Sequence, residues 1–297
     1  MFKSIIKNGS FKGGVHPMES KELSKDLPFE SLPYPKTIYL PLSQHAGKES
    51  KLLVKKGSPV KKGELLAEPD GFISAPIHSP VKGMVTKIAK TAHLSGVPKT
   101  VIEISVSDEG DSSFFQPIDY KNATKEDLLN RIKEAGIVGM GGAAFPAFVK
   151  LSPPPAKKIE KLIINGAECE PYLTRDYRLM LEFTDQLIGG IEILMKIVGV
   201  GCVIGIEDNK PEAVKVLTDK LRGRKDISVK VLPVKYPQGA EKMLIYAVTG
   251  KKVPPGKLPM DVGVVMQNVG TAVSVYKAVV EGEPQITSFV TVTGEGI

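Results

Sequence analysis

The stretch "EKLIINGAECEPYLTRDYRLMLEF", residues 160–183, contains a buried-strand pattern, a polar loop and a helix pattern in one run. The apolar segment at 160–167 predicts a strand that is covered on both faces, as in a parallel sheet. The pattern that continues over 173–199 predicts one long helix. A strand followed directly by a helix is the repeating unit of an α/β fold.

The same alternation continues toward the C-terminus. Further strands are predicted at 201–208, 227–233 and 261–268, and further helices at 209–223, capped by Asn209, at 239–250 and at 270–282. An earlier helix starts within "NATKEDLLNRIKEAGIVG" (122–139), with Thr124 as N-cap, Asp127 three residues later and Gly136 at its end. This order predicts a Rossmann-like α/β domain over 118–283, with helices on both faces of the sheet and ligands beyond the carboxyl ends of the strands.

Residues 34–110, which follow an N-terminal arm at 1–33, consist of short alternating segments separated by glycine and proline. Within them "GSPVKKG" (57–63) returns as "HSPVKG" (78–83), which predicts an all-β barrel or sandwich of two similar halves. The pattern resembles the barrel-sandwich fold of biotinyl and lipoyl carriers, which present a modified lysine on a hairpin. The hairpin "AEPDGFISA" (67–75) has no lysine at its tip. The resemblance therefore predicts the fold, and a carrier or binding module is the least favoured function.

Composition limits the remaining choices. A chain of 297 residues that is 42% hydrophobic can bury two cores. Cys169 and Cys202 are too few for a disulfide framework or a four-thiolate cluster, and the N-terminus has no apolar signal segment, so a cytoplasmic protein is expected. The apolar stretch at 188–206 contains Glu192, Lys196 and several glycines, and predicts helix, turn and strand rather than a membrane span.

The formal net charge of +7 does not indicate a nucleic-acid partner. Specific base readout relies heavily on arginine, and the basic residues are mostly lysines. The arginines are Arg131, Arg175, Arg178, Arg222 and Arg224. Because the lysines are interleaved with glutamate, a solvated surface is the favoured interpretation and an acidic docking partner is the second.

Four predicted loops carry unusual residues. The bare backbone of "GMGGAAFPAFVK" (139–150) suits the close approach of a phosphate or a flat ring, although tight packing explains it equally well. In "NGAECEPYLTRD" (165–176), Glu168 and Glu170 lack the partners of a metal site, and no metal is expected; they suit ribose hydroxyls or a carboxamide. The loop "YPQGAEKM" (236–243) adds Gly239 and Glu241, and "MQNVGT" (266–271) places Asn268 and Thr271 at a helix N-terminus that favours phosphate.

Taken together, the four loops resemble the NADH- and FMN-binding flavoprotein subunit of respiratory complex I. A closer resemblance is to the RnfC subunit of the Rnf ion-translocating electron transport complex, carried by "GGVHP" (13–17), "INGAECEP" (164–171), "YPQGAEKML" (236–244) and "LPMDVGVVMQNVGT" (258–271). Two positions depart from the complex I pattern, since Ala167 replaces an aspartate and Ala240 a glutamate. The resemblance implies a barrel-sandwich domain, an FMN/NADH-binding α/β domain and, at 284–297, the start of a truncated β-grasp domain.

The resemblance also implies roles for individual residues. Glu170 and Glu241 match acids near the nicotinamide and are expected to be catalytic. Phe145 matches an aromatic that stacks on the nucleotide. The remaining residues expected to bind the cofactor are Gly139, Gly141, Gly142, Lys150, Asn165, Glu168, Gly239, Asn268 and Thr271.

The function implied by the resemblance is NADH oxidation by hydride transfer to FMN, in a subunit held at the cytoplasmic side of the cell membrane by other subunits of a ferredoxin:NAD oxidoreductase complex. Two [4Fe-4S] clusters are expected only in a C-terminal region that this chain lacks. Hydride transfer needs stacked rings and exclusion of water, so the protein is expected to act by orientation and electrostatics. The alternative is a non-redox assembly subunit that keeps the fold without flavin.

Overall fold

The structure is a computed structural model that describes residues 10–93, 96–107 and 110–294. These residues form two compact units. The first, called the α/β unit, contains residues 10–29, 150–276 and 289–294, and the second, called the β unit, contains residues 30–149 and 277–288. The predicted domain boundaries follow the order of elements along the chain, whereas this division follows contacts in space.

The α/β unit is built on a parallel sheet with the strand order β10-β9-β8-β11. The strands span Lys161–Gly166 (β8), Cys202–Glu207 (β9), Ile227–Leu232 (β10) and Val264–Asn268 (β11). Ile163, Val264 and Met266 are buried in a core that also includes Leu244 and Ile245 of a covering helix. The continuous apolar runs that predicted buried parallel strands are confirmed.

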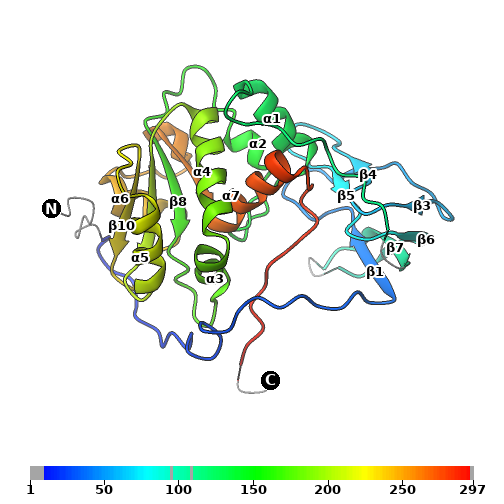
Figure 1. Ribbon diagram of the computed structural model, residues 1–297, viewed down its shortest axis with the longest axis horizontal. Coiled ribbons are helices and arrows are strands. Elements are labelled where there is room, and N and C mark those ends of the chain that lie inside the picture. Colours follow the sequence, from blue (N-terminus) through cyan, green and yellow to red (C-terminus); the bar gives the residue numbers. More distant parts are fainter. Residues whose placement is uncertain (1–9, 94–95, 108–109, 295–297) are drawn as a thin grey trace. The chain divides into compact units, whose positions relative to one another are not determined.

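Helices connect and cover these strands (Figure 1). They are α3 (Arg175–Glu182), α4 (Thr184–Val198), α5 (Pro211–Lys220), α6 (Glu241–Thr249) and α7 (Val269–Tyr276), with a 3-10 turn η1 at Pro259–Val262. Helices α3, α4 and α7 pack together and contact β8, while α6 packs on β9. A Cβ on Gly190 of α4 would collide with the carbonyl oxygen of Ala272 on α7, so glycine allows this close helix contact.

Two details of the helices differ from the sequence prediction. The long helix expected over 173–199 is divided at Phe183, whose φ of −118° and ψ of 34° end α3 before α4 begins. The N-cap of α5 is Lys210, with Pro211 at the first helical position, because the side chain of Asn209 bonds to Glu19 instead. The predicted helix, turn and strand at 188–206 are confirmed, with Gly199 in the left-handed conformation between α4 and β9.

The β unit contains two antiparallel sheets. One has the order β1-β7-β6-β3 and the other β2-β4-β5. The strands are Thr37–Pro41 (β1), Lys51–Leu52 (β2), Pro59–Val60 (β3), Leu65–Glu68 (β4), Ile77–His78 (β5), Gly83–Thr91 (β6) and Lys99–Val106 (β7). The two copies of the predicted repeat meet where Val60 pairs with Gly83, and Leu66, Ile102 and Ile104 fill the shared core.

Helical segments complete the β unit. Helix α1 (Lys125–Glu134) has the predicted capping box, in which Thr124 and Asp127 bond to each other's backbone amides. The short helix α2 (Ala147–Lys150) follows the glycine-rich loop, and the π-helical turn η2 (Lys277–Glu281) packs against α1. Residues 282–294 form neither helix nor strand, so the unfinished strand expected near the C-terminus is not present in its described part.

Candidate functional site

The carboxyl ends of the parallel strands bring most of the predicted site residues of the α/β unit to one edge of its sheet. Asn165 on β8 and Asn268 on β11 are register partners in the ladder. The others follow the same strand ends: Glu168, Glu170, Gly239, Glu241 and Thr271. This edge is where ligands bind to open parallel sheets.

The carboxylate of Glu168 caps the N-terminus of α3. Its Oε1 accepts the amide N–H of Asp176 at 2.5 Å and its Oε2 accepts that of Tyr177 at 3.2 Å. Burial, together with the charge of Asp176, raises the pKa of Glu168 to about 8. Glu168 also has a φ of +49°, in the left-handed region that favours glycine. A residue that the resemblance assigned to the flavin therefore bonds to its own loop and helix in this structure.

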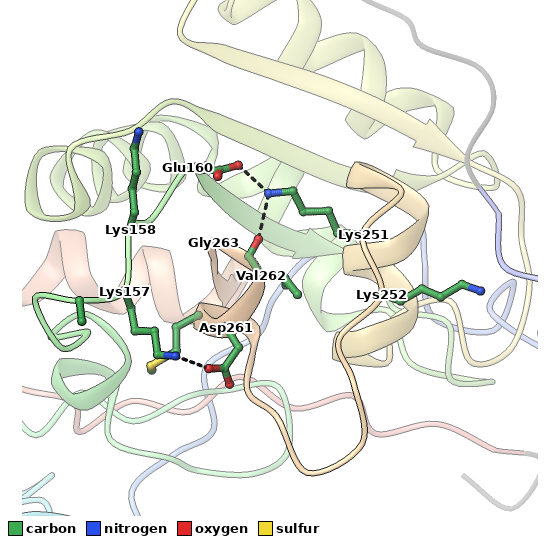
Figure 2. Close-up of a pocket in the computed structure, with 10 residues that line it drawn as sticks. Lys157, Lys158, Glu160, Lys251, Lys252, Asp261, Val262 and Gly263 are labelled. Carbon is green, nitrogen blue, oxygen red and sulfur yellow. Dashed lines mark hydrogen bonds and ion pairs between the residues drawn. The ribbon is translucent and has the colours of Figure 1, made fainter.

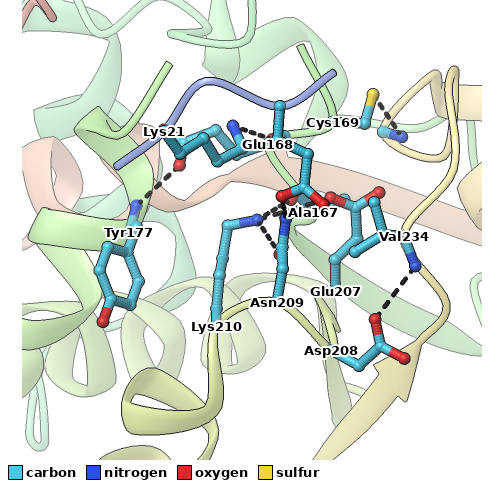
Figure 3. Close-up of polar contacts among 12 residues, drawn as sticks. Lys21, Ala167, Glu168, Cys169, Tyr177, Glu207, Asp208, Asn209, Lys210 and Val234 are labelled. Carbon is cyan, nitrogen blue, oxygen red and sulfur yellow. Dashed lines mark hydrogen bonds and ion pairs between the residues drawn. The ribbon is translucent and has the colours of Figure 1, made fainter. Parts of the chain in front are cut away.

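The ammonium group of Lys21, from the N-terminal arm, holds the acidic loop in place (Figure 3). Its Nζ donates to the carbonyl oxygens of Glu168 and Glu170, both at 2.9 Å, and of Leu173 at 2.5 Å. Lys21 is 7% exposed, and burial lowers its pKa against the opposing charge of Glu168. Three carbonyl acceptors satisfy all three ammonium protons.

Lys210 is a second buried lysine beside this loop. Its Nζ donates to the carbonyl oxygen of Ala167 at 2.7 Å and to Oδ1 of Asn209 at 2.8 Å, and lies 3.5 Å from Oε2 of Glu207. Glu207 is fully buried, and burial raises its pKa. Two buried ammonium groups thus lie next to the predicted acids, and sequence reasoning missed both, since partners more than 40 residues apart leave no local pattern.

Asn165 and Gly239 join two of the predicted loops. Nδ2 of Asn165 donates to the carbonyl oxygen of Gly239 at 2.8 Å, and the amide N–H of Gly239 donates to Sγ of Cys169 at 3.2 Å. A Cβ on Gly239 would lie 3.3 Å from that sulfur, so glycine permits the close approach of the loops. Burial raises the pKa of the Cys169 thiol, which favours its protonated form.

Asn268 is likewise bonded within the protein. Its Nδ2 donates to Oδ2 of Asp176 at 2.6 Å, and its Oδ1 accepts the amide N–H of Gly270 at 2.8 Å. Nε of Arg175 donates to the other oxygen of Asp176 at 2.9 Å. Thr271 is fully buried in the first turn of α7. The N-termini of α3 and α7 are therefore tied together through side chains.

The two acids expected to be catalytic have different surroundings. Oε1 of Glu241 lies 2.7 Å from Nζ of Lys150, and each of these side chains is 34% exposed. Glu170 is exposed, and its carboxylate forms no hydrogen bond or ion pair with any residue in the described part of the chain. Of the predicted acids, Glu170 is the one with a carboxylate open to a ligand.

The glycine-rich loop belongs to the β unit. A hydrogen bond of 2.9 Å from the amide of Gly139 to the carbonyl oxygen of Phe145 closes it. Gly142 has a φ of +109°, and a Cβ added there would meet nothing within 4 Å. Residues 141–143 are exposed and Phe145 is half-buried. Bare backbone in a glycine conformation therefore faces open space, as a flat ring or a phosphate requires.

Two buried glutamines at the carboxyl edge of the sheet were missed by sequence reasoning. Gln238 is fully buried, and neither polar atom of its side-chain amide has a hydrogen-bond partner among the described residues. Nε2 of Gln267, next to Asn268, also lacks one there. A buried amide without partners is costly, so these atoms fit a site completed by a polar ligand. Nothing in the sequence distinguishes a buried glutamine from a surface one.

Metal centres and membrane spans are both missing from the described ranges. No group of three or more His, Cys, Asp or Glu side chains is arranged to hold a metal ion in residues 10–93, 96–107 and 110–294. In the same residues, no helix combines the length and apolar character needed to cross a membrane.

Comparison with known families identifies the class of protein. Residues 9–109 match the RnfC barrel sandwich hybrid domain, and residues 132–277 match the Nuo51 FMN-binding domain. A barrel-sandwich domain followed by an FMN-binding domain of the complex I type is the predicted fold class, which is confirmed. Two structures of an NAD+-reducing [NiFe]-hydrogenase, air-oxidized and H2-reduced, cover 52% and 55% of this chain and 30% and 33% of theirs, at 23% and 22% identity and TM-scores of 0.41 and 0.43.

Curated relatives identify the family. The chain is 46% identical over 291 residues to the RnfC-type subunit of the proton-translocating ferredoxin:NAD(+) oxidoreductase complex of Clostridium ljungdahlii, covering 97% of this chain and 64% of the relative. It is 41% identical to the corresponding subunit of the Na(+)-translocating complex of Acetobacterium woodii, covering 98% and 67%, and 43% identical to that of the ion-translocating complex of Haemophilus influenzae, covering 97% and 35%. The chain belongs to the RnfC family, and spans about two thirds or less of the length of these relatives.

Proposed function

We propose that this chain binds FMN and NADH and oxidises NADH by hydride transfer to the flavin, as part of a ferredoxin:NAD oxidoreductase complex. Two findings support the proposal: the match of residues 132–277 to an FMN-binding domain, and the oxidoreductase complexes to which the relatives belong. In the same proposal, the subunit is peripheral, held by partner subunits at the cytoplasmic face of the cell membrane. The flavin's electrons leave through iron–sulfur clusters in sequence beyond this chain.

The observation that carries the proposal is the open backbone at Gly142. Its positive φ strongly favours glycine, and the space outside it is empty. A loop shaped only by tight packing would instead place neighbouring atoms against that position. The orphaned amide of Gln238 adds a second sign that a polar ligand completes the site.

The residues of this chain supply binding, orientation and charge. FMN, when bound, supplies the flavin ring that accepts a hydride from NADH. The free carboxylate of Glu170 is suited to accept hydrogen bonds from ribose hydroxyls or from the carboxamide of NADH. Lys150 supplies a positive charge that favours an electron-rich flavin, and Glu241 balances that charge before the ligands bind. Phe145 offers a half-buried aromatic surface for stacking.

A second candidate function is an assembly subunit that keeps the fold and binds no flavin. It is favoured by the internal bonding of Asn165, Glu168 and Asn268, whose polar atoms already bond to neighbouring loops. In that case these side chains serve the stability of the fold alone.

Titration of FMN with the purified chain separates the two candidates. We expect quenching of flavin fluorescence at micromolar protein, and loss of quenching in Gly142→Val, where the side chain fills the open backbone surface. Gly223→Val is the matched control, because Gly223 also has a positive φ, of +85°, and open space around it. Absence of quenching by the unchanged chain would reject the flavoprotein function and leave the assembly function.

A further inference from the structure

The amino end of the α/β sheet carries most of the chain's excess positive charge. Residues 156–163 and 250–263 are neighbours there because β8 pairs with β11, with Lys161 opposite Val264. Together these segments hold six lysines and two carboxylates, a net charge of +4 out of the chain's +7. The lysines are Lys157, Lys158, Lys161, Lys251, Lys252 and Lys257. Positive charge is therefore concentrated at this edge rather than evenly mixed with glutamate, as the sequence had suggested.

A hollow of about 570 Å³ lies between the two segments (Figure 2). Two of its lysines are neutralised locally, since Lys157 lies 2.7 Å from Asp261 and Lys251 lies 2.5 Å from Glu160. Its other lysines, Lys158 and Lys252, form no ion pair with a carboxylate in the described part of the chain; Lys252 lies over the ring of Tyr246 at 5.7 Å. The hollow thus has ordered walls and unpaired charge.

We propose that this hollow and its lysine rim dock an acidic surface of a protein, namely another subunit of the complex, which rests on the proposed function only in that such a complex is assumed. Opposite charges on two protein surfaces set the orientation of docking and suppress wrong partners. The lysine side chains are flexible and spread over two segments, so they match carboxylates distributed over a surface better than a single compact anion.

The backbone and composition of the hollow argue against a phosphate group and a lipid surface. The amides of Glu160 and Lys161 both donate to the carbonyl oxygen of Gly263, and the amide of Gly263 donates to Met260, so these N–H groups are not available to a phosphate. Neither segment contains arginine or tryptophan, residues that favour phosphate forks and membrane interfaces. Leu258, 57% exposed, provides an apolar contact beside the lysines, as protein interfaces do.

The position of the hollow keeps the two proposed activities separate. Strand β8 runs from Lys161, beside the hollow, to Gly166, at the edge where FMN and NADH are proposed to bind. Six residues of strand span about 20 Å. A partner seated on the lysines therefore leaves the nucleotide edge free.

The test uses the full-length subunit within its membrane complex. The double variant Lys158→Glu, Lys252→Glu reverses the unpaired charges and keeps the ion pairs of Lys157 and Lys251. The matched control, Lys215→Glu, Lys225→Glu, makes the same charge change at two exposed lysines elsewhere in the α/β unit. Membranes carrying each complex are washed with increasing NaCl, and the subunit that remains is quantified against an integral membrane subunit.

We expect the double variant to be released at about half the NaCl concentration that releases the unchanged subunit, because screening and charge reversal weaken the same contact. The control should behave as the unchanged subunit. Equal release of both double variants would overturn the proposal. So would sedimentation of the unchanged chain, but not of Lys158→Glu, Lys252→Glu, with phosphatidylserine vesicles, since the occupant would then be lipid. Flavin titration of the same proteins separates the outcomes: lost flavin binding rejects the proposed function alone, and a subunit absent from the complex at low salt rejects both.

Discussion

Nζ of Lys150 lies 2.7 Å from Oε1 of Glu241, so the lysine assigned to the flavin and an acid assigned to the nicotinamide form one ion pair. The two residues are 91 positions apart, at the end of α2 and the start of α6. Both side chains are partly exposed, which leaves each able to exchange its partner for a charged ligand. The pair therefore links the proposed binding of flavin to the proposed binding of NADH.

We predict that Lys150→Met weakens FMN binding and that Glu241→Gln raises the KM for NADH. Because solvent screens the pair, each change should lower stability by only about 0.2–1 kcal/mol. A double-mutant cycle on the Kd for FMN measures the coupling, which should be non-zero if the released lysine turns to the flavin. Additive effects of the two substitutions on FMN and NADH binding would contradict a shared role.

The two acids of the loop after β8 should respond differently to replacement. Glu168→Gln leaves one of two backbone amides of α3 without a carboxylate acceptor, and should cost about 1–3 kcal/mol of stability. Glu170→Gln changes an exposed carboxylate without a protein partner, so it should leave the melting temperature unchanged and raise the KM for NADH. Melting curves and steady-state kinetics on both variants test this assignment. Equal loss of stability in both would show that Glu170, too, is only structural.

Stability should fall with rising pH because of Glu168. Its pKa is raised from about 4.5 to about 8 by burial and by the charge of Asp176. A raised carboxyl pKa gives stability that is complete below the unfolded value and is lost as pH rises through the folded value. The melting temperature of the unchanged chain relative to Glu168→Gln should therefore decrease between about pH 4.5 and pH 8. Glu207 also has a raised pKa, but it is present in both proteins and its effect cancels. Parallel melting curves over this range would refute the assignment.

Local features of the fold were predictable from the sequence because their causes lie within a few residues. The capping box of Thr124 and Asp127 and the glycine that ends α4 follow from spacing alone. The division of the predicted long helix at Phe183 was not predictable, since no glycine or proline marks it. Asn209 matched the composition of a helix cap, but a contact with Glu19, 190 residues away, engages its side chain.

The candidate site was predictable as a set of loops and much less as a set of contacts. The alternation of strands and helices places Asn165 and Asn268 at one edge, and their register pairing follows from the parallel sheet. The partners of these residues depend on tertiary packing. Lys21 bonds to carbonyls 147 to 152 residues away, and no periodicity in the sequence indicates such a contact.

Lys21 offers a direct test of how the acidic loop is held. Lys21→Met keeps the aliphatic stem and removes the ammonium, leaving the carbonyls of Glu168, Glu170 and Leu173 without that donor. We expect a lower melting temperature and faster amide exchange in residues 168–173, together with a higher KM for NADH. Lys25→Met, at an exposed lysine of the same arm, should change none of these. If exchange in this loop is unchanged, the arm does not position it.

The two cysteines lead to the last prediction, which concerns electron transfer. A four-iron cluster usually takes four thiolates, and the chain has two cysteines. Cys202 is 2% exposed within β9, where burial raises its pKa, and Sγ of Cys169 accepts a hydrogen bond from Gly239. With FMN added, the chain should reduce ferricyanide with NADH, yet show no iron–sulfur absorption or paramagnetic signal after anaerobic reconstitution with iron and sulfide. Cys169→Ser should leave the ferricyanide rate unchanged. A four-iron spectrum from these 297 residues would overturn the division of labour between this chain and the rest of the subunit.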